Sequence, residues 1–135
     1  MLHLVRNYTK SSTRDQMKKP VKILIKDIAW TVQVLEDKEY EDAHGKDSHG
    51  ITDKNKQTVD LKRSSFSLSL VKHELLHVYV ASCCINSIED LDDSGMEELC
   101  AEIIEFHLED LAKHAKSLHT KLKTQINKRQ SYEQE

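Results

Sequence analysis

Residues 73 to 77 read His73-Glu74-Leu75-Leu76-His77, the pattern HExxH, within a largely apolar stretch. The segment from Lys62 to Glu89 contains no Pro or Gly, and Ser64 and Ser65 stand near its start as candidate N-caps. These features predict a buried α-helix. Because successive residues of a helix turn by about 100°, His73 and His77 lie about 40° apart and leave one face, where a single metal ion can bridge them.

Glu74 projects about a quarter turn away from the two histidines. It is therefore poorly placed as a third ligand on their face, but it can reach a water bound to the metal, which is where a general base must sit. Burying such polar groups among apolar residues without partners costs a few kcal/mol each, and a metal would satisfy them. We interpret His73 and His77 as metal ligands and Glu74 as the catalytic base.

A catalytic zinc site uses three protein ligands and leaves one position open for water, so a third ligand is needed. Residues 92 to 102 begin with N-cap residues and continue with a helical pattern that carries Glu97, Glu98 and Glu102. Ser94 and Glu97 form a capping-box pattern, which gives Glu97 a structural role. Glu98 and Glu102 share a face one turn apart, so Glu98 is the predicted ligand, and Glu97 and Glu102 remain alternatives.

HExxH followed by this Glu-bearing segment resembles the gluzincin metallopeptidases, whose third ligand is a Glu in an ExxxD or ExxxE context. The stretch from Gly50 to Phe106 is most similar to the small ImmA/IrrE-like peptidases of phages and bacteria. The Ala-Asn and Phe-Ala pairs usual in that family appear here as Cys100-Ala101 and Glu105-Phe106. The resemblance implies a minimal zincin fold, in which a small sheet precedes the HExxH helix and the Glu helix.

The resemblance also implies an activity, which is the zinc-dependent hydrolysis of peptide bonds. His73, His77 and Glu98 would hold Zn²⁺, and Glu74 would take a proton from the metal-bound water and return it to the leaving amine. The substrate would be a protein or peptide, such as a transcriptional repressor of a phage or mobile element. In such families an edge strand beside the metal cleft pairs with extended substrate, and residues 57 to 61 are the candidate strand.

Two other interpretations remain open. One is a non-catalytic metal-binding regulatory or protein-interaction module with a zincin-like fold, although a site without turnover has no use for Glu74. The other is a helical interaction protein in which HExxH arose by chance, because histidine makes up 8 of the 135 residues. Tyr79 is the nearest phenol but points off the ligand face, so no second oxyanion donor is identified. Five further histidines lack helical partners and are expected to be solvated: His44, His49, His107, His114 and His119.

The order of the predicted elements favours an α+β fold with an antiparallel-type sheet. Residues 21–26 and 29–35 have β-branched and aromatic residues in partial alternation and predict two strands joined near Asp27. Residues 50–52 and 57–61 flank a turn and predict a hairpin. We expect a basic N-terminal arm over residues 1–19, one zincin-like domain over 20–123, and a charged, frayed tail over 124–135.

A long apolar stripe marks the last predicted helix. Its members recur at spacings of three and four residues, at Ile104, Leu108, Leu111, Ala115, Leu118 and Leu122. This spacing predicts either packing on the chain's own sheet and HExxH helix, or a dimer or partner contact through the distal half of the helix.

Composition limits the class of protein. A length of 135 residues with 38% hydrophobic and 32% charged residues predicts one small domain. The net charge of −3 gives no strong signal for nucleic-acid binding. No stretch approaches the roughly 18 apolar residues of a membrane span, the N-terminus lacks a signal-peptide core, and three cysteines form an odd set. We therefore expect a cytoplasmic protein without a disulfide framework.

Overall fold

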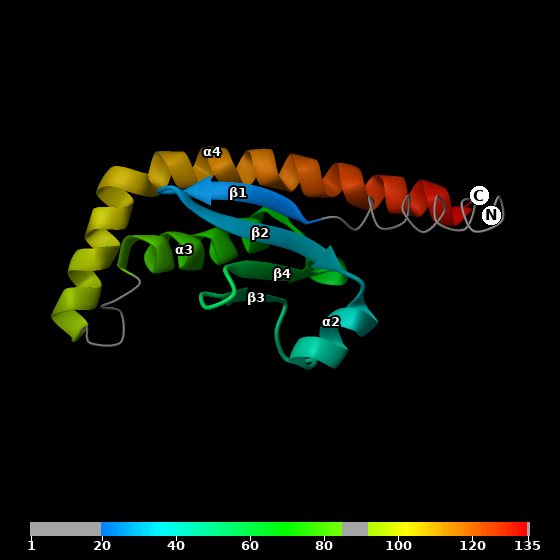
Figure 1. Ribbon diagram of the computed structural model, residues 1–135, viewed down its shortest axis with the longest axis horizontal. Coiled ribbons are helices and arrows are strands. Elements are labelled where there is room, and N and C mark those ends of the chain that lie inside the picture. Colours follow the sequence, from blue (N-terminus) through cyan, green and yellow to red (C-terminus); the bar gives the residue numbers. More distant parts are fainter. Residues whose placement is uncertain (1–19, 85–91, 135) are drawn as a thin grey trace, which may run out of the picture.

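The computed structural model describes residues 20–84 and 92–134 of the chain. It has the α+β architecture predicted from the sequence, with a four-stranded sheet and helices packed against it (Figure 1). The expected N-terminal arm, residues 1–19, lies outside the described residues. The elements in chain order are β1 (Val21–Ile25), β2 (Ile28–Leu35), α2 (Asp37–His44), β3 (Gly50–Asp53), β4 (Thr58–Lys62), a 3₁₀ turn (Arg63–Ser65), α3 (Leu68–Cys84) and α4 (Asp93–Gln134).

Strands β1 and β2 form the first predicted hairpin and pair antiparallel. Their connection consists of Lys26 and Asp27, with φ of 49° and 65°. Two consecutive left-handed residues match the twist of the flanking strands in a two-residue hairpin turn. The predicted junction near Asp27 is therefore confirmed.

The sheet is mixed, with strand order β1-β2-β4-β3. We expected an antiparallel-type sheet, but β2 and β4 run parallel. The reason is the connection, because α2 and β3 together carry the chain back before β4 begins beside β2. Residues 57 to 61 therefore belong to an inner strand, and their prediction as an edge strand was wrong. The edges of the described sheet are β1 and β3.

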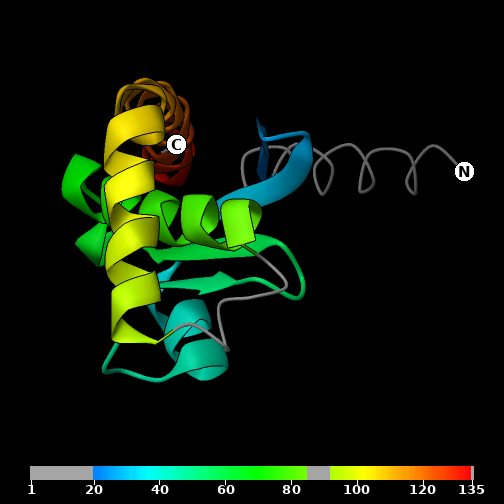
Figure 2. The same cartoon turned by 90° about the vertical axis from the view of Figure 1, so that its left-hand side faces the viewer.

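The two faces of the sheet carry different side chains. Trp30, Val32 and Val34 of β2, with Val59 and Leu61 of β4, are buried in the main core. Helices α3 and α4 lie over this face, as the two views show (Figures 1 and 2). The alternate residues point to the other face, where α2 packs. The helical layer that carries HExxH is therefore fixed to the sheet by an apolar interface.

Ion pairs hold α2 against the opposite face. Lys62 Nζ donates to Glu41 Oε1 at 2.8 Å, which raises the Lys62 pKa above its ordinary value. Asp60 accepts from the Gln33 side chain at 2.9 Å and lies 2.8 Å from His44 Nε2. These contacts tie α2 to β4, and β4 to β2, so β4 is supported from both faces.

The caps of α3 and α4 differ from those predicted. Ser67 Oγ accepts from Leu70 N–H at 3.1 Å, so Ser67 caps α3 and the predicted Ser64 and Ser65 lie in the preceding 3₁₀ turn. Asp92 Oδ1 accepts from Gly95 N–H at 2.7 Å, so α4 begins one residue before the predicted capping box. The capping-box role predicted for Glu97 therefore does not apply at this helix start.

Helix α4 changes direction along its length. Its first part stands across the end of α3, and its longer second part runs along the sheet beside β1 (Figures 1 and 2). The predicted apolar stripe divides at this change: Ile104 and Leu108 are exposed, whereas Leu111 and the stripe residues after it are buried in the chain's own core. The distal stripe therefore serves the core, and a partner contact there remains an untested prediction.

The helix also continues beyond Lys123, where we expected a frayed tail. It ends at Gln134, and Ile126 packs against the core. Arg129 is only 5% exposed and donates from Nη1 to the Val34 carbonyl at 3.0 Å. This bond fastens the end of the helix to the end of β2. Across residues 20–84 and 92–134, none of the helices is both long enough and apolar enough to cross a membrane.

Candidate metal centre

Helix α3 presents His73 and His77 on its exposed face, as the spacing predicted. Their ring centroids lie 5.1 Å apart and the rings are inclined by 75°. The His73 side chain is 67% exposed, so its nitrogens are accessible from solvent. Two accessible imidazoles one helical turn apart can bind the same ion.

Glu74 lies at the inner side of this pair, between α3 and the edge strand β3. It is only 4% exposed, and its Oε1 accepts a hydrogen bond of 3.0 Å from Thr52 Oγ1. The second oxygen, Oε2, lies 4.0 Å from His73 Nε2. One carboxylate oxygen is thus held by the sheet while the other lies on the side of the histidines.

Gly50 makes room for this carboxylate. A Cβ at Gly50 would stand 3.0 Å from Glu74 Cγ, 3.1 Å from its Cδ and 3.2 Å from Oε2. Such contacts are closer than ordinary van der Waals packing, so any side chain at this position would push the glutamate aside. The backbone of β3 and the hydroxyl of Thr52 together fix where the Glu74 carboxylate sits.

The three residues form a group with the geometry of a metal site. Candidate ligand atoms of His73, Glu74 and His77 all lie within 4.8 Å of one another. Within residues 20–84 and 92–134 this is the one such group. Two neutral imidazole nitrogens with nearby carboxylate oxygen are donors that Zn²⁺ accepts, so the residues present fit this ion.

The structure does not bring the predicted third ligand into the group. Glu97, Glu98 and Glu102 lie in the first turns of α4, and all three side chains are exposed. Leu99 and Ile103 form the buried side of the same turns. Helices α3 and α4 pack together, so these turns lie on an element that contacts the HExxH helix. None of the three glutamates is selected by the geometry, and Glu98 remains a prediction.

The sequence did not reveal the parts that β3 plays. Gly50 and Thr52 contact Glu74 across 24 and 22 positions of the chain, and no local pattern links such distant residues. One signal was available at Gly50, because a glycine inside a strand often marks close approach of another group to the backbone. Thr52 has no comparable signal, since threonine is common in strands for its shape alone.

Several tyrosine and histidine side chains outside the group have partners elsewhere in the described part of the chain. Tyr79 is 3% exposed and its ring lies 5.8 Å from that of His107, which agrees with its predicted direction away from the ligands. Of the histidines expected to be solvated, His44 and His119 are partly exposed and also have partners: Asp60 lies 2.8 Å from His44 Nε2, and the rings of Phe66 and His119 stack at 5.0 Å. These partners come from distant segments, which sequence spacing could not show.

Comparison with known proteins identified no relative of this chain. The chain matches no protein-family model, no curated protein and no solved structure.

Proposed function

We propose that this chain is a zinc-dependent metallopeptidase. The observation that carries the proposal is the pair of accessible imidazoles, His73 and His77, beside a buried carboxylate, Glu74, whose position is set by a neighbouring strand. A carboxylate that lies beside a metal site, and is not required as a ligand of the ion, is suited to proton transfer. The resemblance of the HExxH and Glu segments to gluzincins supports the same activity.

The histidines would hold the ion together with a third protein ligand. Glu98 is our candidate for that ligand, and Glu97 and Glu102 are the alternatives, because all three lie on the helix that packs against α3. When bound, Zn²⁺ lowers the pKa of a water toward about 7 and polarises the scissile carbonyl. The ImmA/IrrE-like peptidases provide the model for this ligand set.

Glu74 is the general base and then the general acid. Thr52 occupies Oε1, so Oε2 on the histidine side is the oxygen that takes the proton from the attacking water. The water oxygen bonds to the carbonyl carbon, the C–N bond breaks, and the proton moves from Glu74 to the leaving nitrogen. Burial strengthens this role, because the carboxylate needs no rearrangement of solvent before it acts.

The substrate would be an extended peptide that adds to the edge strand β3. Gly50 and Thr52 of this strand contact Glu74, so a chain paired with β3 would pass close to the base. The family resemblance suggests a selective regulatory protease that cleaves one partner, such as a transcriptional repressor. Strand β3 takes the place of residues 57 to 61 as the proposed substrate-binding strand, because those residues belong to an inner strand of the sheet.

The alternative is a metal-binding regulatory module without turnover. One observation favours it: within residues 20–84 and 92–134 the group contains no candidate ligand beyond His73, Glu74 and His77, and Glu74 is held by Thr52 on the strand side. A two-histidine site without a third protein ligand would bind zinc weakly and would not position a substrate carbonyl.

The test compares wild type with Glu74→Gln on a defined peptide library, with cleavage products read by mass spectrometry. The peptidase proposal expects zinc-dependent cleavage by wild type, and none by the variant although it retains zinc. Undiminished cleavage by Glu74→Gln, or cleavage in excess chelator, contradicts the mechanism. Zinc binding without cleavage of any peptide favours the non-catalytic module. Zinc titration of Glu97→Ala, Glu98→Ala and Glu102→Ala identifies the third ligand as the one whose loss weakens binding most.

A further inference from the structure

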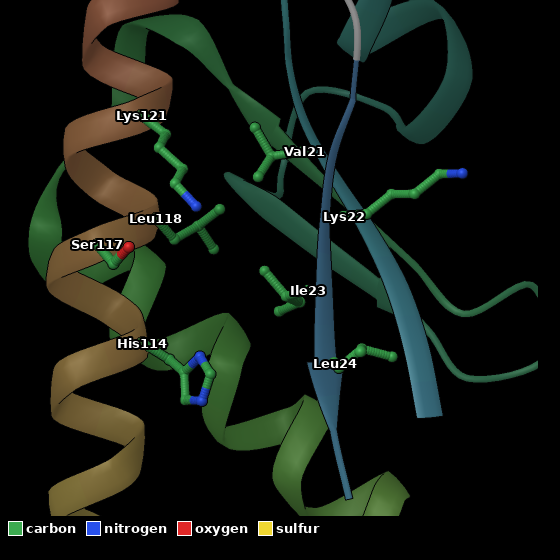
Figure 3. Close-up of a pocket in the computed structure, with 8 residues that line it drawn as sticks. All are labelled: Val21, Lys22, Ile23, Leu24, His114, Ser117, Leu118 and Lys121. Carbon is green, nitrogen blue, oxygen red and sulfur yellow. The ribbon is translucent and has the colours of Figure 1, made fainter. Parts of the chain in front are cut away.

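A second candidate site lies at the edge of the sheet opposite β3. It is a cavity of about 330 Å³ between β1 and α4, lined by residues 21–24 of β1 and by His114, Ser117, Leu118 and Lys121 of α4 (Figure 3). Small-ligand sites have volumes of about 300–1,000 Å³, so this cavity is large enough to hold a ligand. It shares no residue with the His73–Glu74–His77 group.

The cavity runs along the edge of β1. Four consecutive residues of the strand line it, although side chains of a strand alternate between its faces. In Figure 3, Val21 and Ile23 point toward α4, and Lys22 and Leu24 point away from it. The latter two therefore meet the cavity through the main chain. Among the described strands β1 pairs with β2 alone, so its outer backbone groups are available to another strand.

The two walls of the cavity have matching lengths. Residues 21–24 of a strand span about 10 Å at roughly 3.3 Å per residue. Residues 114 to 121 of a helix span about the same distance at roughly 1.5 Å per residue. Over this length α4 covers one side of the cavity and the main chain of β1 borders it, so the two elements bound a groove for about three residues of extended chain.

The groove is both basic and apolar. Its ionisable lining side chains are cations or imidazole, and no acidic side chain lines it among the described residues. Lys121 extends from α4 into the space beside Val21, and its amino nitrogen lies between helix and strand (Figure 3). Leu118, which is 2% exposed, supplies an apolar floor. An occupant that matches this lining carries a carboxylate and an apolar side chain.

We propose that this groove binds the carboxyl-terminal end of a partner protein as an added strand along β1. The groove admits only a short segment, and Lys121 stands at one end of it, which suits a charge at the end of a chain better than one in its middle. The terminal carboxylate would contact Lys121, and the last apolar side chain would pack on Leu118. This site is separate from the proposed zinc site and does not depend on it.

The test uses the full-length chain and fluorescein-labelled hexapeptides that end in Val, Ile or Leu with a free carboxylate. The matched probes have the same sequences with a C-terminal amide. Anisotropy should show binding of the acids, weakened at least about tenfold in the amides. Amide chemical shifts should move at residues 21–24. Equal binding of acids and amides, or no binding of either, overturns the proposal.

Two charge reversals provide the matched comparison. Lys121→Glu should weaken binding of the acid peptides at least about tenfold, whereas Lys123→Glu, an exposed position outside the lining, should change it less than about twofold. Circular dichroism checks that both variants fold. His73→Ala should bind the peptides as wild type does. Loss of binding in His73→Ala, or chemical shifts confined to Gly50–Asp53, would place the peptide at the metal site and refute a groove at β1.

Discussion

Replacing Thr52 by Val tests how the Glu74 carboxylate is held. The change exchanges a hydroxyl for a methyl group of similar shape, in a strand that favours β-branched residues. It removes the 3.0 Å hydrogen bond to a carboxylate that is only 4% exposed. A hydrogen bond to a charged group contributes about 1.5–3 kcal/mol, and we expect the free energy of unfolding at pH 7 to fall by that amount.

Urea denaturation of metal-free protein measures the loss. The matched control is Thr58→Val on the neighbouring strand, whose hydroxyl makes no hydrogen bond with the described residues; it should change stability by less than about 0.5 kcal/mol. In the Glu74→Gln background the hydrogen bond is between neutral groups, so Thr52→Val should cost only about 0.5–1.5 kcal/mol. A Thr52→Val variant as stable as the control, or an equal loss in both backgrounds, refutes the assignment.

Three further predictions follow from other contacts. Gly50→Ala should displace the Glu74 carboxylate, because the new Cβ would meet the Glu74 side chain at 3.0–3.2 Å. Peptide cleavage should fall about tenfold or more, whereas zinc affinity, measured by titration, should stay within about threefold of wild type. Arg129→Ala should lower the free energy of unfolding by about 1–3 kcal/mol, because it removes the hydrogen bond to the Val34 carbonyl. Lys128→Ala, a change at the exposed neighbouring residue, should alter this free energy by less than about 0.5 kcal/mol. Equal effects of the two substitutions would contradict a role of Arg129 in fastening α4 to β2. Asp37 accepts from Ser64 N–H, and this bond lowers the Asp37 pKa, so its stabilising effect is complete above the ordinary value near 3.8 and is lost as pH falls through the folded pKa. Asp37→Asn should be less stable than wild type at pH 7, and denaturation at a series of lower pH values should show this difference shrinking below pH 3.8.

Local geometry explains which parts of the site could be predicted. The separation of His73 and His77 follows from helical pitch once Pro and Gly are absent, and the structure places both rings on one exposed face. The inner side of the site could not be predicted in this way. Thr52 reaches Glu74 only because β3 is the edge strand, and that depends on β4 pairing parallel with β2.

The helices show the same limit. Ser67 caps α3 in place of the predicted Ser64 and Ser65, and Asp92 caps α4 in place of Ser94, since position relative to the sheet decides where a helix starts. The sequence does not predict the change of direction in α4, because no Pro or Gly occurs between Met96 and Gln134. Burial of Leu111 but not of Leu108 depends on this change, which a continuous apolar stripe does not reveal.

The most direct test of the zinc site is the metal content of purified protein by elemental analysis. Wild type and His49→Ala, a variant of an exposed histidine outside the group, should each contain about one zinc ion per chain after zinc is supplied at neutral pH. His77→Ala should contain almost none. Absence of zinc from wild type, or equal zinc in His77→Ala, would contradict the account of HExxH as a metal centre.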